Sequence, residues 1–209
     1  MRLLAYLITA MLFVGPAHAL DEMDIDGLYR NISPPQPTAD ATKVEVLEVF
    51  WYRCPHCNAF QPYADAYQES KPEYVNFRRM PAVLRDSWVP QAKMFYVAES
   101  LGMLEQVHKK IFAAIHKQEK PMSSRADIRS FFVENGADGA KFDAAFDSFS
   151  TDSQVRQADA QTRRLGITGV PTIIINGRYR TSGQIAGSYE TVLEVVKVLA
   201  EKEHKRMSK

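Results

Sequence analysis

The two cysteines of the chain lie three positions apart, within the stretch FWYRCPHC at residues 50–57. A pair with this spacing can form a structural disulfide, half of a metal site, a haem attachment or a redox-active dithiol. Each of these uses makes different demands on the surrounding residues, so the rest of the sequence can distinguish between them.

Three of these four uses fit the sequence poorly. A disulfide between residues three apart closes a very small loop, and the stabilisation gained from loop closure grows with loop length. A structural zinc site takes about four ligands at fixed spacings, whereas this chain has one CxxC and scattered histidines. Haem attachment needs a histidine directly after the second cysteine, and that position is Asn58. We therefore expect no metal and no organic cofactor.

A redox role fits the local structure that the sequence predicts. Cys54 follows an apolar run typical of a buried strand and precedes a helical pattern, which places it at a helix N-terminus. Free backbone N–H groups and the positive end of the helix dipole stabilise a thiolate there. Pro55 suits the first helical turn, and His56 can donate to the Cys54 sulfur or add positive charge beside it. Cys57, one turn further on, is expected to be the buried, resolving cysteine.

One acidic residue interrupts the apolar strand that leads into the cysteines. Glu48 lies between Leu47 and Val49, and an unpaired buried carboxylate is unfavourable. Two interpretations remain open. The residue lies at an edge and reaches water, or it is a buried acid with a raised pKa that exchanges a proton near Cys57.

The N-terminus has the parts of a secretory signal. A positively charged start, an apolar run at residues 3–14, a Gly-Pro break and Ala17-His18-Ala19 follow one another. The apolar run is shorter than the ~20 residues that a spanning helix needs. Residues 1–19 are therefore predicted to be a cleaved signal peptide, and the mature protein is expected outside the cytosol, where disulfides persist.

The charge of the chain argues against nucleic acid as a partner. The formal net charge is +1, and acidic and basic residues are mixed along the sequence. The basic tail at residues 202–209 is predicted to be a solvated helix end, because a nucleic-acid site needs a basic stripe or patch.

The predicted elements begin with strand and helix and become helical further on. Strands are predicted at residues 44–50 and 76–80 with a helix between them, and residues from about 90 to 165 are helical throughout. Within that region a capping box at Ser124 to Asp127 opens a helix. Phe142, Phe146 and Phe149 sit at helical spacing, and another helix is predicted from about residue 153.

Strand character returns near the C-terminus. Asn176-Gly177 between two apolar runs predicts a hairpin, because both turn positions need positive φ. A final amphipathic helix is predicted from about residue 189 to residue 203. The order predicts an α/β core interrupted by an all-helical insertion.

These motifs resemble those of the DsbA family, the periplasmic thiol:disulfide oxidoreductases. The resemblance is carried by CPHC with the preceding residues 47–53, and by Gly169-Val170-Pro171-Thr172, which is similar to the loop that keeps a cis-proline facing the active site. Residues 123–149 resemble part of the family's helical insertion. The resemblance implies a thioredoxin fold with an inserted all-helical domain, the thioredoxin-like part at residues 20–84 and 166–209 and the insertion at 85–165.

The resemblance also implies roles for individual residues. Cys54 and Cys57 would form the redox disulfide, with Cys54 as the nucleophile that joins the substrate and Cys57 as the residue that resolves the mixed disulfide. Val170 and Pro171 would line the substrate groove, although Pro171 is also compatible with an ordinary strand start. The family has an acid at the position of Glu48, and Arg79 is the candidate for its basic partner.

The function implied is that of a monomeric periplasmic oxidase. It would donate its disulfide to folding secreted proteins with free cysteines and be reoxidised by a DsbB-type membrane quinone reductase. An isomerase or reductant on the same fold is the alternative, but only a short segment precedes the first predicted strand, where DsbC-type isomerases carry a dimerisation region. A chaperone-like peptide binder is a further alternative. One departure is Arg53, which stands where the family has an uncharged, often aromatic residue.

Overall fold

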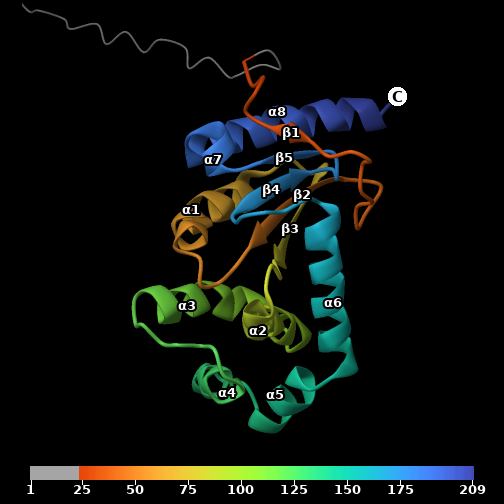
Figure 1. Cartoon of the computed structure of the whole chain (residues 1–209). Helices are drawn as coiled ribbons and strands as arrows, with labels where there is room; N and C mark the ends of the chain where they lie inside the picture. The colour runs from red at the N-terminus through yellow and green to blue at the C-terminus, as the bar shows by residue number, and fades with distance from the viewer. Residues whose placement is uncertain (1–23) are drawn as a thin grey trace, which may run out of the picture.

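The computed structural model describes residues 24–209, which form a mixed five-stranded sheet with helices on both faces (Figure 1). The strand order is β1-β5-β4-β2-β3. The strands are β1 Arg30–Asn31, β2 Val44–Phe50, β3 Val75–Pro81, β4 Thr172–Ile175 and β5 Tyr179–Thr181. Strand β2 pairs in parallel with β3 and antiparallel with β4, so it has a neighbour on each side. The segment predicted to be a signal peptide lies outside the described residues.

Strand β2 is buried along its whole length because both faces of the sheet are covered. Val44 and Val46 face the helices α1, Pro55–Ser70, and α8, Tyr189–Met207. The alternate residues of β2 face the other side, where helix α6, Phe149–Arg164, packs on the sheet. The predicted strand is thus fully internal, and helix α1 follows it after a four-residue turn that contains Cys54.

Between β3 and β4 the described chain is helical. These elements are η1 Asp86–Trp88, α2 Val89–Ser100, α3 Leu104–His116, α4 Arg125–Glu134, α5 Gly139–Phe146 and α6 Phe149–Arg164. Most of them gather beyond the end of the sheet at which β2 runs into α1 (Figure 1). The predicted α/β core interrupted by helices is therefore confirmed, whereas the exact division at residues 85 and 165 stays a prediction.

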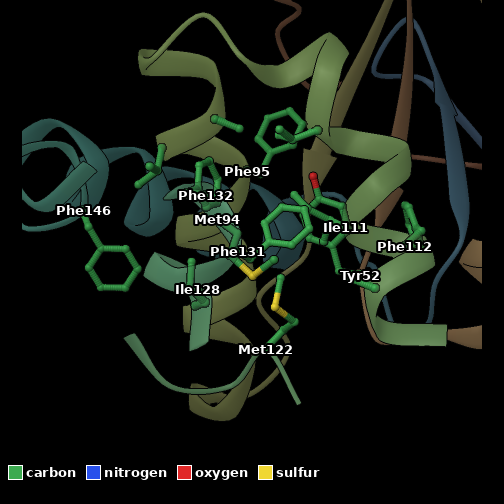
Figure 2. Packing of buried hydrophobic residues seen from close by; sticks show 14 of the residues in the cluster. Tyr52, Met94, Phe95, Ile111, Phe112, Met122, Ile128, Phe131, Phe132 and Phe146 are labelled. Atoms are coloured by element: carbon green, nitrogen blue, oxygen red, sulfur yellow. The ribbon is translucent and has the colours of Figure 1, made fainter. Parts of the chain in front are cut away.

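The helices share an aromatic core that continues into the cysteine-bearing turn. Phe95, Phe112 and Phe132 pack together inside it with Met94 and Ile111 (Figure 2). Phe50, Tyr52, Cys54 and Cys57 belong to the same buried cluster. The helical part is thus packed directly against the turn between β2 and α1.

Local signals at element ends mostly held. Ser124 and Asp127 form the predicted capping box, with helix α4 starting at Arg125. The predicted hairpin joins β4 to β5, with φ of 49° at Asn176 and 63° at Gly177. Among residues 24–209, no helix combines the length and apolar character needed to cross a bilayer.

The predicted helical spacing of Phe142, Phe146 and Phe149 does not extend to Phe149, because Phe149 belongs to another helix. Phe142 and Phe146 are buried on α5, whereas Phe149 begins α6 and is 81 % exposed. The reason is a helix cap inside the apparent periodicity. The Ser148 side chain accepts a hydrogen bond from the backbone N–H of Thr151, which starts a new helix in a new direction.

Candidate active site at the Cys54–Cys57 turn

Cys54 is the N-cap residue of helix α1, as the sequence predicts. Its backbone is extended, with φ −79° and ψ 118°, and its Sγ accepts a hydrogen bond from the Cys57 backbone N–H at 3.4 Å. Pro55 occupies the first helical turn, where no N–H is needed. Both cysteines are free thiols in this structure.

The surroundings of Cys54 favour its thiolate. The pKa of Cys54 is lowered to about 6, first by a hydrogen bond from the Cys57 side chain and then by the backbone N–H groups of Cys57 and His56, against the opposing effect of burial. The charge of His56 also lowers this pKa, but it is the smallest of these contributions. The helix N-terminus and the neighbouring thiol therefore matter more than the histidine that the sequence emphasises.

Cys57 is the opposite of Cys54 in its electrostatics. It is fully buried, and burial raises its pKa far above that of an ordinary thiol. The hydrogen bond with Cys54 and the negative charge of the Cys54 thiolate raise the pKa of Cys57 further. The backbone N–H of Trp51 donates to the Cys57 sulfur at 3.5 Å. One sulfur of the pair is thus suited to carry charge and the other to stay protonated.

The loop before β4 lies against the Cys54 sulfur. The Cys54 thiol is 3.4 Å from the carbonyl oxygen of Val170 and donates to it, and the Val170–Pro171 peptide bond is cis. A pocket of about 870 Å³ adjoins this contact and is lined in part by His56, Val170 and Pro171. The structure therefore brings together the predicted cysteines, the histidine between them and the predicted groove residues.

Glu48 lies beneath the cysteines in the interior of the sheet. The interpretation as an edge residue is wrong, because β2 is paired on both sides and Glu48 is 0 % exposed. Arg79 lies directly opposite on β3, and its Nε donates to the Glu48 carboxylate at 2.9 Å. Burial raises the pKa of Glu48, while the charge and the hydrogen bond of Arg79 oppose that rise without cancelling it.

Gln61 connects Glu48 to the buried cysteine. Its side-chain amide is 3.2 Å from the Glu48 carboxylate and 3.5 Å from the Cys57 carbonyl oxygen. Glu48 also contributes to the raised pKa of Cys57, as expected for a carboxylate near a thiol. Because α1 places Gln61 one turn after Cys57, the predicted acid and the predicted resolving cysteine share one buried environment.

The sequence analysis missed a second set of contacts, which fixes the residues just before Cys54. The Tyr52 hydroxyl is hydrogen-bonded to Nδ1 of His108 at 2.8 Å, and His116 Nε2 donates to the Tyr52 carbonyl at the same distance. Burial lowers the pKa of His108 to about 3, so it is neutral at pH 7. Both histidines come from helix α3, more than fifty residues along the chain, and no local pattern links them to Tyr52.

Two residues beside the cysteines also contact the helical part. The Trp51 ring stacks on Trp88 with ring centres 4.0 Å apart, and its indole N–H donates to Gln91. Arg53, the departure from the family pattern, donates to the carbonyl oxygen of Pro121, in the loop that precedes α4. Within residues 24–209, no group of three or more His, Cys, Asp or Glu side chains is arranged to hold a metal ion.

Comparison with known proteins decides the family. The family profile described as a DSBA-like thioredoxin domain matches residues 84–194. The thiol:disulfide interchange protein DsbA of Pseudomonas aeruginosa is 37 % identical over 201 residues, which cover 96 % of this chain and 95 % of that protein. The chain belongs to the DsbA family.

Solved structures of the DsbA family agree with this assignment. The crystal structure of Pseudomonas aeruginosa DsbA matches with a TM-score of 0.84 and 36 % identity, over 88 % of this chain and 96 % of that one. The oxidoreductase DsbA of Xylella fastidiosa matches with a TM-score of 0.79 and 30 % identity, over 85 % and 95 % of the two chains. The predicted thioredoxin fold of the DsbA type is thereby confirmed.

Proposed function

We propose that this protein is a thiol:disulfide oxidase that passes a Cys54–Cys57 disulfide to pairs of cysteines in other proteins. The observation that carries the proposal is the asymmetry of the two thiols. The pKa of Cys54 is lowered to about 6, whereas the pKa of Cys57 is raised by burial. A thiol with a stabilised thiolate is a good leaving group, so reduction of the disulfide is favoured.

The exchange balances in two steps. A substrate thiolate attacks Cys54 of the disulfide, the bond to Cys57 breaks, and Cys57 takes up a proton. A second substrate thiolate then attacks the substrate sulfur of the mixed disulfide, and Cys54 leaves as a thiolate. The substrate loses two electrons and becomes a disulfide, while the protein gains them and becomes the dithiol.

The raised pKa of Cys57 makes a proton donor necessary in the first step. Glu48 is the residue proposed for that role, because it is buried in the same environment and its own pKa is raised. In the reverse step, when the disulfide is reformed, the carboxylate would accept the proton of Cys57. Arg79 holds the carboxylate in place through its hydrogen bond.

The size of the driving force follows from the Cys54 pKa. A shift from the ordinary value of 9.0 to about 6 favours the folded thiolate at pH 7 by about 1.4 kcal/mol. For a two-electron couple this corresponds to roughly 30 mV toward a more oxidising disulfide. The sign supports a donor of disulfides over a reductant.

The substrates proposed are secreted proteins that fold with free cysteines. An extended substrate segment would pair with the backbone of Val170 in the groove beside Pro171, in the manner of an added strand. After removal of residues 1–19 the protein would act as a monomer in the periplasm. A DsbB-type membrane quinone reductase would reoxidise it by accepting the two electrons.

A trapping experiment tests the oxidase proposal. In Cys57→Ala the resolving thiol is missing. When the variant is mixed with substrate proteins that carry disulfides, the Cys54 thiolate should attack one substrate sulfur and release the other as a thiolate, and the resulting mixed disulfide should accumulate until a reductant is added. The Cys54→Ala/Cys57→Ala double variant is the matched control and should trap nothing. Absence of a trapped species in Cys57→Ala would favour the non-covalent peptide binder. A reduction potential in the range of known cytosolic reductants would favour the isomerase or reductant alternative.

A further inference from the structure

The pocket beside Cys54 extends well beyond the groove residues at Val170 and Pro171. Its volume is about 870 Å³. The walls are formed by the loop at residues 166–171, by the segment from the end of β5 into the short helix α7, Gly183–Ala186, and by the start of α8. Arg30 and Arg180 also line it. A segment bound at Cys54 therefore has room to continue toward these two arginines.

Arg30 and Arg180 are paired with each other across the sheet. They are direct partners in the antiparallel pairing of β1 with β5, so their side chains emerge on the same face of the sheet. Like charges at directly opposite positions are unfavourable for the strand pair itself. The two arginines therefore do not stabilise the pairing of β1 with β5, and sheet stability does not explain why both lie at one wall of the pocket.

Neither arginine has a carboxylate partner within residues 24–209. Arg180 donates to the carbonyl oxygens of Leu165 and Gly166, and Arg30 donates to those of Gly27 and Tyr29. Carbonyl oxygens orient a guanidinium but do not neutralise it, and the remaining N–H groups of each fork stay available.

The acid in the pocket wall is engaged elsewhere. Glu190 accepts a hydrogen bond from the Tyr63 hydroxyl on α1, and this bond lowers the pKa of Glu190. Tyr189, next to it, donates to the His56 carbonyl, so the start of α8 lies close to the cysteine turn. The negative charge therefore belongs to the end of the pocket near the cysteines, and the arginines mark a wall with unbalanced positive charge.

The loop at residues 166–171 relates the arginines to the reactive sulfur. Arg180 is bound to Gly166 at the start of this loop, and Cys54 is bound to Val170 near its end. Four residues of chain span at most about 14 Å. A substrate segment that follows the loop in an extended form would reach from Cys54 to the arginines in about four residues.

We infer that this pocket selects protein segments in which an Asp or Glu lies about three to five residues from the reactive cysteine, through its contact with Arg30 and Arg180. The inference rests on the proposed oxidase function and adds a substrate preference to it. A planar carboxylate matches the fork of a guanidinium, and a pair of forks at one wall can hold it from two sides.

The test uses reduced dithiol peptides that differ at one position. Each peptide carries two cysteines in a neutral, flexible sequence, with Glu, Gln or Lys four residues from the first or from the second cysteine. The rate of peptide oxidation by the disulfide form is measured at low ionic strength. Only one of the two placements should bring the Glu to the arginines. With that placement the Glu peptide should react about fivefold faster than the Gln peptide, and the Lys peptide should be the slowest. Added salt should reduce these differences.

Matched variants assign the preference to the two arginines. In Arg30→Gln/Arg180→Gln the Glu and Gln peptides should react at similar rates, and the readout is the ratio of these two rates within each variant, so a change in the absolute rate does not affect the comparison. Arg30→Lys/Arg180→Lys should keep part of the preference. Lys141→Gln/Arg156→Gln removes the same charge from the helical part, away from the pocket lining, and should keep all of it.

The outcomes separate the inference from the function on which it rests. Equal rates for all peptides in the unmodified protein would overturn the acidic preference and leave the oxidase function standing. A preference that survives in Arg30→Gln/Arg180→Gln, with an unfolding curve like that of the unmodified protein, would also overturn it. Failure to oxidise any peptide would overturn the proposed function and the inference with it.

Discussion

A completely buried carboxylate lies near each end of the sheet, and the pKa values of the two carboxylates are shifted in opposite directions. Glu48 lies in β2 near the cysteines, and Glu203 lies in α8 near the hairpin between β4 and β5. Both side chains are 0 % exposed. The pKa of Glu48 is raised, whereas the pKa of Glu203 is lowered.

The difference comes from the partners of each carboxylate. Burial disfavours ionisation of Glu203, but hydrogen bonds from Arg206 and Asn176 and the charges of Arg206 and Arg178 outweigh it. The side chains of Arg206 and Arg178 are 47 % and 37 % exposed, so their charges stay partly hydrated and the desolvation penalty is small. Glu48 has one arginine, which is itself only 10 % exposed and also binds Asp65.

The comparison shows which end of the molecule is built for stability and which for reaction. At the hairpin end several donors converge on one oxygen of the buried acid, Oε2 of Glu203, as in a structural ion pair, while Oε1 has no hydrogen-bond partner among the described residues. At the cysteine end, Glu48 on β2 has a raised pKa, and the N-cap and first turn of α1 contain one thiol with a lowered pKa and one with a raised pKa. Perturbed groups of this kind cluster at functional sites.

The largest effect is expected when Glu48 loses its arginine. Arg79→Leu should lower the free energy of unfolding at pH 7 by about 3 kcal/mol, because it leaves a buried carboxylate without a cation. Urea unfolding measures this change. The Glu48→Gln/Arg79→Leu double variant should recover part of the loss.

A neighbouring arginine provides the control for this prediction. Arg78 pairs with the buried Glu45 but is itself 42 % exposed. Arg78→Leu should therefore lower the free energy of unfolding clearly less than Arg79→Leu does. Equal losses for the two variants would show that the buried position of Arg79 has no special importance.

The next effect concerns the hairpin end. Glu203→Gln should lower the free energy of unfolding by about 2 kcal/mol at pH 7, because charged hydrogen bonds to Arg206 and Asn176 are weakened. Since the pKa of Glu203 is lowered, its contribution is present above pH ~4.3, the ordinary value, and is lost as pH falls through the folded pKa. The difference in the free energy of unfolding between Glu203→Gln and the unmodified protein should therefore become smaller as the pH is lowered below this value. Glu201→Gln, which alters an exposed ion pair of the same helix, should have a much smaller effect.

A smaller effect should separate the reduced and oxidised forms. Because the folded pKa of Cys54 is about 6, its thiolate stabilises the reduced protein fully above the ordinary thiol pKa, and this stabilisation is lost as pH falls through 6. Between pH 5 and pH 7 the reduced form should gain about 1.3 kcal/mol of stability relative to the oxidised form. Thermal unfolding of both forms at the two pH values measures the gain. A difference independent of pH would contradict the thiolate argument and with it the proposed donor function.

The smallest change in stability, and the most informative in sign, is expected for Glu48→Gln. At pH 7 the free energy of unfolding of the variant should lie within about 1 kcal/mol of that of the unmodified protein, because Arg79 keeps its ion pair with Asp65 and the Gln side-chain oxygen can still accept its hydrogen bond. The raised pKa of Glu48 means that the unmodified protein loses stability as pH rises above ~4.3, and the variant does not. Glu48→Gln should thus gain relative stability with rising pH, whereas Glu203→Gln should lose it. The same trend in both variants would erase the contrast between the two ends.

The sequence by itself determined the elements and the chemistry of the cysteine turn. The β-branched run at residues 44–50, the cap at Ser124 and the Asn176-Gly177 turn act through neighbours in the chain, so their effects are local and were readable. The position of Cys54 at a helix N-terminus and the burial of Cys57 follow from the same local order. Periodicity failed where a cap interrupts it, as at Ser148 before the exposed Phe149.

Only the tertiary structure decided how strongly these residues are perturbed and which others surround them. Whether Glu48 is an edge residue or a buried acid depends on the strands that pair with β2, and those come from both halves of the chain. The contacts of Tyr52 with His108 and His116, and the pairing of Arg30 with Arg180, join segments far apart in sequence. Desolvation and ion pairing depend on distances in space, and no local pattern of residues encodes them.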